Sequence, residues 1–359
     1  MSSDRIKGFD GLRAIAFLLV FVSHKIPTGV TDRLGSVAVW LFFVLSGFLI
    51  TRILGRQREG IEAAKISQFA ALSNFYRGRI LRIFPPYYAL LVVLAILAAC
   101  GFYHPVSLGM QRADWFFYSN IYIERHGWEG DLGHLWSLAV EQQYYALFAP
   151  IVLFLPRRWL PGICAGLLAV SVGANGYFLA QGRPQTTFDV NSIVNIGLFG
   201  FGGLAGIFAG RPLPRALLNA PALILVFGLI LLFPILTPNP LFIETCRPAV
   251  GLLAACLLVQ ISQTQNGMVV RALDFAPFRL LGVISYAAYL FHPVIHSEAI
   301  LNFFGFNGHV HLRGSFVMDL AITVILASLS WILLERPLIQ FGRARRTRRS
   351  NDATSLPKS

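Results

Sequence analysis

Runs of about 20 apolar residues recur along this chain of 359 residues, and they constrain its fold more than any other feature. A bilayer core takes one such run per helix, and backbone groups inside lipid must be satisfied within the segment. The composition agrees, since 55% of the residues are hydrophobic and only 13% are charged. The sequence therefore predicts an all-α, polytopic transmembrane bundle. We expect a membrane domain over residues 1–342 and a basic, disordered cytoplasmic tail over residues 343–359.

The charged residues predict how this bundle is oriented. When about ten spans are alternated, 23 of the 30 Lys and Arg residues fall in one set of loops, so the positive-inside rule places both termini in the cytoplasm. The net charge of +13 does not indicate nucleic-acid binding, because the basic tail directly follows a span and suits anionic lipid. The first run lacks a small-residue cleavage site and is expected to stay as a helix. The expected spans are 12–28, 35–54, 85–103, 135–155, 160–180, 193–209, 219–237, 247–262, 279–297 and 315–335.

Two further features lie outside the spans or give no chemical signal. The long loop at 104–134 is rich in aromatic residues, and it is expected to lie in the membrane interface or to cover a substrate entrance. The four cysteines have no paired spacing and are interpreted as small buried hydrophobic residues. A disulfide between Cys100 and Cys246 is a minor alternative.

Ionisable residues inside spans are costly and mark functional sites by default. Arg13 and His24 lie eleven residues apart, on nearly the same face of the first span and roughly 16 Å apart along its axis. Glu141 shares one side of the helix predicted over 135–155 with His134 and Ser137, next to Trp136, and it is expected roughly 10 Å below the outer surface. A buried carboxylate there needs a partner or a proton.

Other polar positions allow both a functional and a structural interpretation. Arg79 and Arg82 share a helix face and suit phosphate oxygens, although topology anchoring is an equal alternative. Ser46 and Gly47 favour close helix packing over direct chemistry. His292 and His296 have a spacing that could suit a metal, but no third ligand is evident, and no metal is expected.

Six stretches follow one another along the chain, namely Arg13 with His24, Phe42–Phe48, Arg79–Tyr87, Trp136–Tyr145, Ser285–His292 and a closing Glu-Arg-Pro. Together and in this order, they resemble the motifs of the acyltransferase-3 family of membrane O-acyltransferases. The likeness runs from Gly11-Leu-Arg13 to Glu335-Arg336-Pro337, and no fused periplasmic hydrolase-like domain is expected.

The resemblance implies an enzyme of a bacterial inner membrane that moves an acyl group, usually acetyl, from cytoplasmic acyl-CoA to a carbohydrate hydroxyl. We expect His24 to act as general base or as an acyl-accepting nucleophile, with Glu141 orienting it. The donor is expected near Arg13, Arg79, Arg82, Ser46 and Gly47. Substrate-binding or supporting roles are expected for His134, Trp136, Ser137, Tyr145, Tyr286 and His292. The main alternative is a transporter or flippase for a glycan or another anionic substrate.

Overall fold

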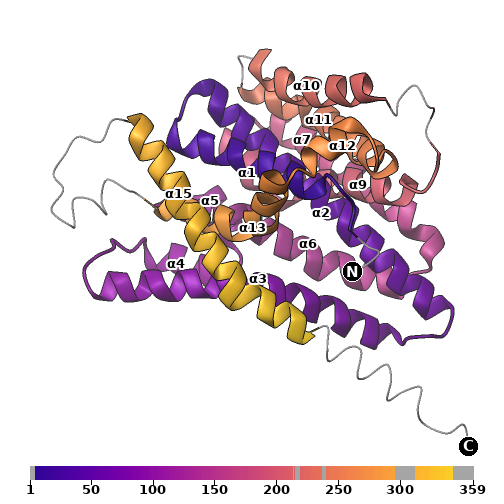
Figure 1. The fold of residues 1–359 in the computed structure, drawn as a ribbon, viewed down its shortest axis with the longest axis horizontal. Coiled ribbons are helices and arrows are strands. Elements are labelled where there is room, and N and C mark those ends of the chain that lie inside the picture. Colours follow the sequence, from indigo (N-terminus) through magenta and orange to yellow (C-terminus); the bar gives the residue numbers. More distant parts are fainter. Residues whose placement is uncertain (1–4, 213, 215–218, 237–239, 296–311, 343–359) are drawn as a thin grey trace, which may run out of the picture.

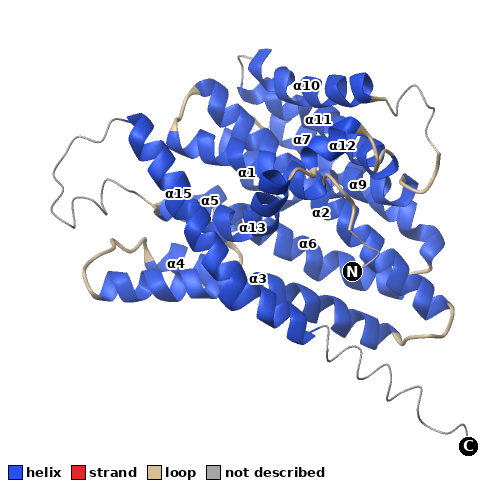
Figure 2. Ribbon diagram, viewed as in Figure 1, coloured by secondary structure: helices blue, strands red, loops and turns tan. Residues whose placement is uncertain are grey.

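The computed structural model describes residues 5–212, 214, 219–236, 240–295 and 312–342. Its described residues form helices and connecting loops without a strand, which confirms the all-α prediction (Figure 2). The predicted tail at 343–359 lies outside the described residues. In chain order the elements are α1 Phe9–Lys25, α2 Gly29–Glu62, α3 Gln68–Ala99, α4 Leu108–Trp115, α5 Ser119–His126, α6 Leu135–Phe154, η1 Arg157–Trp159, α7 Leu160–Ala180, α8 Gln185–Val190, α9 Ser192–Phe208, α10 Ala220–Leu236, α11 Pro240–Gln263, α12 Met268–Leu273, α13 Ala276–Phe291, η3 His292–Val294, α15 Leu312–Ser330 and the π-helical η4 Trp331–Glu335.

Each of the ten predicted spans coincides with a helix, but helix length varies widely. Helices of 16 or 17 residues, such as α1, α9 and α13, are about 24–26 Å long at 1.5 Å per residue. A hydrocarbon core is about 30 Å thick. Among the described residues, five helices are long and apolar enough to cross a membrane, namely Gly29–Glu62, Gln68–Ala99, Arg157–Ala180, Cys246–Gln263 and Phe316–Gly342.

The predicted loop at 52–84 is the largest departure from the expected boundaries. Helix α2 continues through it to Glu62, and α3 begins at Gln68 rather than near 85. The Ser67 hydroxyl caps the new helix by accepting a hydrogen bond from the Ala70 amide. Hydropathy marks where a helix leaves lipid, whereas Arg, Gln and Glu are good helix formers that continue it into water. Arg79 and Arg82 consequently lie in the middle of α3.

Glycines set how closely the central helices approach. On α9, Gly202 and Gly206 face α2, where a Cβ on Gly202 would lie 2.0 Å from the Val44 carbonyl oxygen. Gly200 faces α7 instead, and its Cβ would lie 2.7 Å from the Cys164 carbonyl oxygen. Small residues four apart allow two backbones to pack in contact within a membrane. The glycine-rich sequence of α9 therefore places this helix between α2 and α7.

Helices α1 and α13 also meet through a glycine. A Cβ on Gly282 would lie 1.8 Å from the Asp10 carbonyl oxygen, so only glycine allows this approach. From that crossing the two helices run in the same direction, which brings the ends that carry His24 and His292 together. Helix α15 (yellow) lies along α13, and its continuation through η4 reaches α3 (Figure 1).

The aromatic loop at 104–134 contains two short helices, α4 and α5, packed beside α6. Its Asp114 is 1% exposed. Burial raises the pKa of this carboxyl to about 8. Cys100, at the end of α3, carries a free thiol, so the alternative disulfide to Cys246 is not formed.

We expect Asp114→Asn to stabilise the protein at alkaline pH. The folded pKa of about 8 lies above the unfolded value of about 3.9, so the folded state holds more protons between these values. Wild-type stability should therefore fall as pH rises from about 4 to about 8, and the amide should remove this loss, a difference on the order of 5 kcal/mol. Thermal unfolding in detergent across this range measures it. Asp131→Asn, an exposed carboxyl in the same loop, is the control, and parallel pH profiles for wild type and Asp114→Asn would contradict the prediction.

Candidate active site

His24 and His292 are in direct contact. The Nδ1 atom of His24 lies 2.7 Å from Nε2 of His292, and the two rings stack with centroids 4.9 Å apart and planes 7° apart. His292 Nδ1 in turn lies 2.8 Å from the Tyr289 carbonyl oxygen. His292 is fully buried, whereas His24 is exposed in the structure. These contacts form a chain that runs from the backbone of α13 to an accessible imidazole on α1.

Aromatic rings enclose the buried member of this chain. Phe17 and Phe21 of α1 each have ring centroids 6.0 Å from that of His292. The His134 ring lies 5.5 Å from His292, and its Nε2 donates to the Leu290 carbonyl oxygen at 3.2 Å. A close-packed apolar environment leaves His292 a single orientation.

An ion pair fixes the end of α1 beside His24. The Lys25 ammonium lies 2.7 Å from the Asp319 carboxylate of α15, and the two side chains are only 10% and 5% exposed. Lys25 also donates to the Ile295 carbonyl oxygen. Neither residue was predicted as part of the site, although an acidic residue inside a predicted span is itself a functional or structural signal.

A cavity of about 90 Å³ lies among α1, α2, α3, α6 and α13. Most of the predicted polar residues meet there, although they come from five separate helices. Glu141 accepts hydrogen bonds from the hydroxyls of Ser46 and Tyr145. The lining comprises Arg13, Val39, Phe42, Phe43, Ser46, Arg79, Arg82, Ile83, Ser137, Leu138, Glu141, Tyr145, Ser285, Tyr286 and Tyr289.

The hydrogen bonds of His24 and Glu141 show how the site differs from the predicted pair. His24 bonds to His292, whereas Glu141 bonds to Ser46 and Tyr145. Depth along the helices placed His24 and Glu141 at a similar level, but depth carries no information about which way a side chain turns around its helix. Among the described residues, the partner that orients His24 is therefore the second histidine.

Tyr289 connects the cavity to the histidine chain. It lies within the Ser285–His292 stretch but was not itself predicted as a site residue. Its hydroxyl lines the cavity and lies 2.7 Å from the Ser137 hydroxyl, while its carbonyl oxygen holds His292. The same hydroxyl donates to the His134 carbonyl oxygen at 3.2 Å. One residue of α13 thus contacts both halves of the site.

The remaining predicted residues have packing contacts. Gly47 faces α9, where a Cβ would lie 2.3 Å from the Phe199 carbonyl oxygen, so the close-packing alternative describes it. Trp136 packs edge-on against Phe43. The Tyr286 hydroxyl donates to the Ile83 carbonyl oxygen at 3.0 Å and joins α13 to α3. Within the described residues, no group of three His, Cys, Asp or Glu side chains could hold a metal, and His296 lies outside them.

Comparison with known proteins identifies the family to which this fold belongs. The profile of the acyltransferase-3 family, described as an acyltransferase domain, matches residues 6–335. The chain belongs to the acyltransferase-3 family. This membership confirms the resemblance predicted from the six motifs, and it covers every helix that contributes to the cavity and to the histidine chain.

Several similar proteins are named as O-acetyltransferases. The peptidoglycan O-acetyltransferase OatA of Listeria monocytogenes is 27% identical over 95% of this chain and 57% of its own length. The O-acetyltransferase OatA of Staphylococcus aureus is 24% identical over 94% of this chain and 58% of its own length. The putative peptidoglycan O-acetyltransferase YrhL of Bacillus subtilis is 28% identical over 93% and 55%. The chain thus spans just over half the length of these relatives, and no solved structure matches it.

Proposed function

We propose that this protein is an O-acyltransferase that moves an acetyl group from cytoplasmic acetyl-CoA to a hydroxyl of a cell-envelope glycan. The names of its relatives favour peptidoglycan as the acceptor. The proposal includes ten spans, both termini in the cytoplasm and a place in the bacterial inner membrane. The observation that carries it is the hydrogen-bond chain from the Tyr289 carbonyl oxygen through His292 to His24.

This chain assigns the protons of both imidazoles. A carbonyl oxygen only accepts, so His292 Nδ1 donates to Tyr289, and the Nε2 of neutral His292 must be an acceptor. His24 Nδ1 therefore donates to it, which leaves His24 Nε2 without a proton. An exposed imidazole with a fixed, unprotonated Nε2 is suited to general-base catalysis.

In the proposed reaction, His24 Nε2 takes the proton of the acceptor hydroxyl as that oxygen attacks the thioester carbonyl. The carbon–sulfur bond then breaks, an ester forms, and the imidazolium returns the proton to the departing thiolate, so that free CoA leaves. His292 Nε2 accepts the Nδ1 hydrogen bond throughout and stabilises the positive charge on His24 while it lasts. The acyl-histidine alternative uses the same nitrogen as a nucleophile.

The size of the cavity limits which part of the donor it can hold. A volume of about 90 Å³ is well below the roughly 300–1,000 Å³ of sites that hold drug-sized ligands, so the cavity suits an acyl group rather than a nucleotide. Three arginines and one glutamate line it, so it carries an excess of positive charge. We assign Arg13, Arg79 and Arg82 to binding of the acyl donor. Because the cavity is small, we propose that these arginines contact the thioester end of the donor.

Acyl transfer by the purified protein tests this function. The full chain in lipid nanodiscs is incubated with radiolabelled acetyl-CoA and either peptidoglycan fragments or unrelated saccharides. We expect label to enter the peptidoglycan fragments and to be released by mild base, as an ester is. Label that stays on CoA with every acceptor would contradict the proposal, and movement of unmodified saccharide across a vesicle membrane would favour the transporter alternative instead.

A further inference from the structure

A second and larger cavity, of about 610 Å³, opens between α2, the start of α7 and the end of α9. It shares no lining residue with the candidate active site. Its volume lies within the range of ordinary small-molecule sites, about 300–1,000 Å³. The lining comprises Thr51, Arg52, Gly55, Arg56, Glu59, Glu62, Arg157, Arg158, Leu160, Pro161, Gly206, Ile207 and Gly210.

Positive charge exceeds negative charge in this cavity. Four arginines and two glutamates line it, and both glutamates are engaged by neighbouring groups. The Glu59 carboxylate lies 2.6 Å from the Arg157 guanidinium. Glu62 accepts from the Arg157 amide at 2.9 Å and from Arg58 at 3.1 Å. The lining therefore favours an anion, since a concave surface of one sign concentrates its field.

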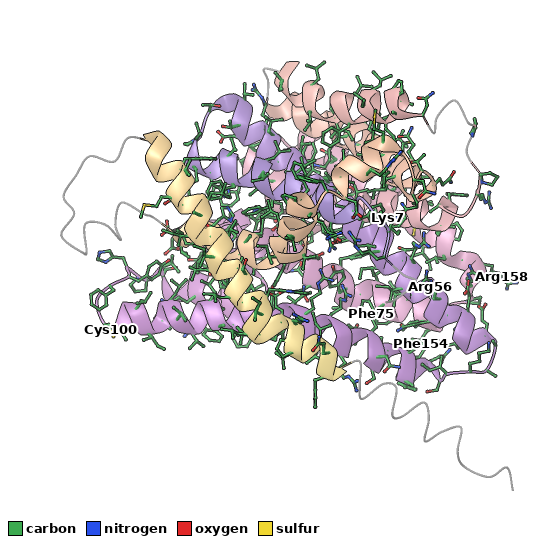
Figure 3. The ribbon with its side chains drawn as sticks, viewed as in Figure 1. Lys7, Arg56, Phe75, Cys100, Phe154 and Arg158 are labelled. Atoms are coloured by element: carbon green, nitrogen blue, oxygen red, sulfur yellow. The ribbon has the colours of Figure 1, made fainter. Side chains whose placement is uncertain are left out.

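Thr51 lines the cavity but is 1% exposed, and its hydroxyl lies beside Tyr144 and Cys164, so the arginines offer the hydrogen-bond donors that a ligand would meet. The cavity is open at Gly210, which has no side chain and where an added Cβ would meet nothing within 4 Å. Figure 3 labels Arg56 and Arg158, which approach this region from α2 and from η1.

We propose that this cavity binds an organic phosphate, with Arg52, Arg56 and Arg158 pairing with its oxygens. Guanidinium groups match phosphate geometry through two parallel hydrogen bonds, and a dianionic phosphate balances the net charge of the lining. Leu160, Pro161 and Ile207 provide apolar surface for the part of the ligand that bears the phosphate. The phosphate belongs either to an anionic lipid headgroup or to a soluble nucleotide. The nucleotide would be the end of the acyl donor that lies away from the thioester, and only this second source rests on the proposed function.

Binding to the full chain separates these sources. One arm counts phosphatidylglycerol molecules retained by the detergent-purified protein in native mass spectrometry, with phosphatidylcholine as the neutral comparison. The other arm measures binding of adenosine 3′,5′-bisphosphate by calorimetry. We expect at least one probe to bind, and Arg56→Gln/Arg158→Gln to weaken it by about tenfold or more, because charged hydrogen bonds contribute about 1.5–3 kcal/mol each.

Two further variants control for charge and for folding. Lys7→Gln/Arg271→Gln removes the same charge from exposed positions outside both cavities and should leave binding unchanged. Gly210→Leu keeps every charge but fills the cavity, so it should weaken binding as well. Each variant is first checked for an unchanged melting temperature without probe. Failure of both probes to bind the wild type would overturn the proposal. Equal binding by the wild type, the double Arg variant and Gly210→Leu would overturn it as well. Neither measurement depends on acyl transfer.

Discussion

Replacing His24 with alanine is expected to abolish acyl transfer, with kcat lowered by about 10²–10⁴-fold and the fold intact. This range is what general-base catalysis contributes, and the exposed position of His24 makes its truncation structurally mild. Product formation from radiolabelled acetyl-CoA measures the effect, and size-exclusion profiles establish folding. His104→Ala, an exposed histidine in the loop before α4, is the matched control and should retain full activity. Activity of His24→Ala within a few-fold of wild type would exclude the proposed mechanism.

The same assay tests whether His292 orients His24 through a hydrogen bond or only fills space. Gln at this position can offer an amide oxygen to the His24 Nδ1 proton, whereas Leu cannot. We therefore expect His292→Gln to retain more activity than His292→Leu, because only Gln can hold the His24 tautomer whose Nε2 is free to take a proton. Equal loss in both variants would indicate that His292 only fills space.

Replacing Gly202 with valine is expected to prevent correct assembly of the bundle. Its Cβ would lie 2.0 Å from the Val44 carbonyl oxygen and 2.7 Å from the Phe48 amide nitrogen, and backbone atoms cannot move aside as a side chain can. We expect a loss of about 3 kcal/mol or more, because α2 and α9 would have to separate. Yield and melting temperature in detergent report it.

Gly173→Val provides the control for this substitution. Gly173 also lies within an apolar helix, α7, but a Cβ there meets nothing within 4 Å. It should therefore melt close to wild type. A Gly202→Val protein that melts like Gly173→Val would show that α2 and α9 do not pack as closely as described.

The helices and the polar positions could be predicted from the sequence, because long apolar runs and buried ionisable residues are local signals. The residue at which α3 begins could not be predicted, since helix formers such as Arg and Gln continue a helix beyond the apolar run. Of the predicted site residues, Arg13, Ser46 and Glu141 all line the smaller cavity. Their roles in binding and catalysis stay predictions.

Contacts between helices were beyond the reach of the sequence alone. The His24–His292 hydrogen bond joins residues 268 positions apart, and it depends on the approach of α1 to α13 at Gly282. Spacing within one helix predicts which residues share its face, but it does not predict which neighbour that face meets. The larger cavity was missed for a similar reason, since its arginines were assigned to topology.

The ion pair between Lys25 and Asp319 makes the site dependent on the order of synthesis. His24 lies on the first helix to leave the ribosome, but its neighbour Lys25 gains its partner only when α15 has been made and inserted. The proposed catalytic base near the start of the chain is thus held next to an ion pair whose acidic partner comes from α15, so a chain cut short before α15 would lack the contact that fixes the end of α1.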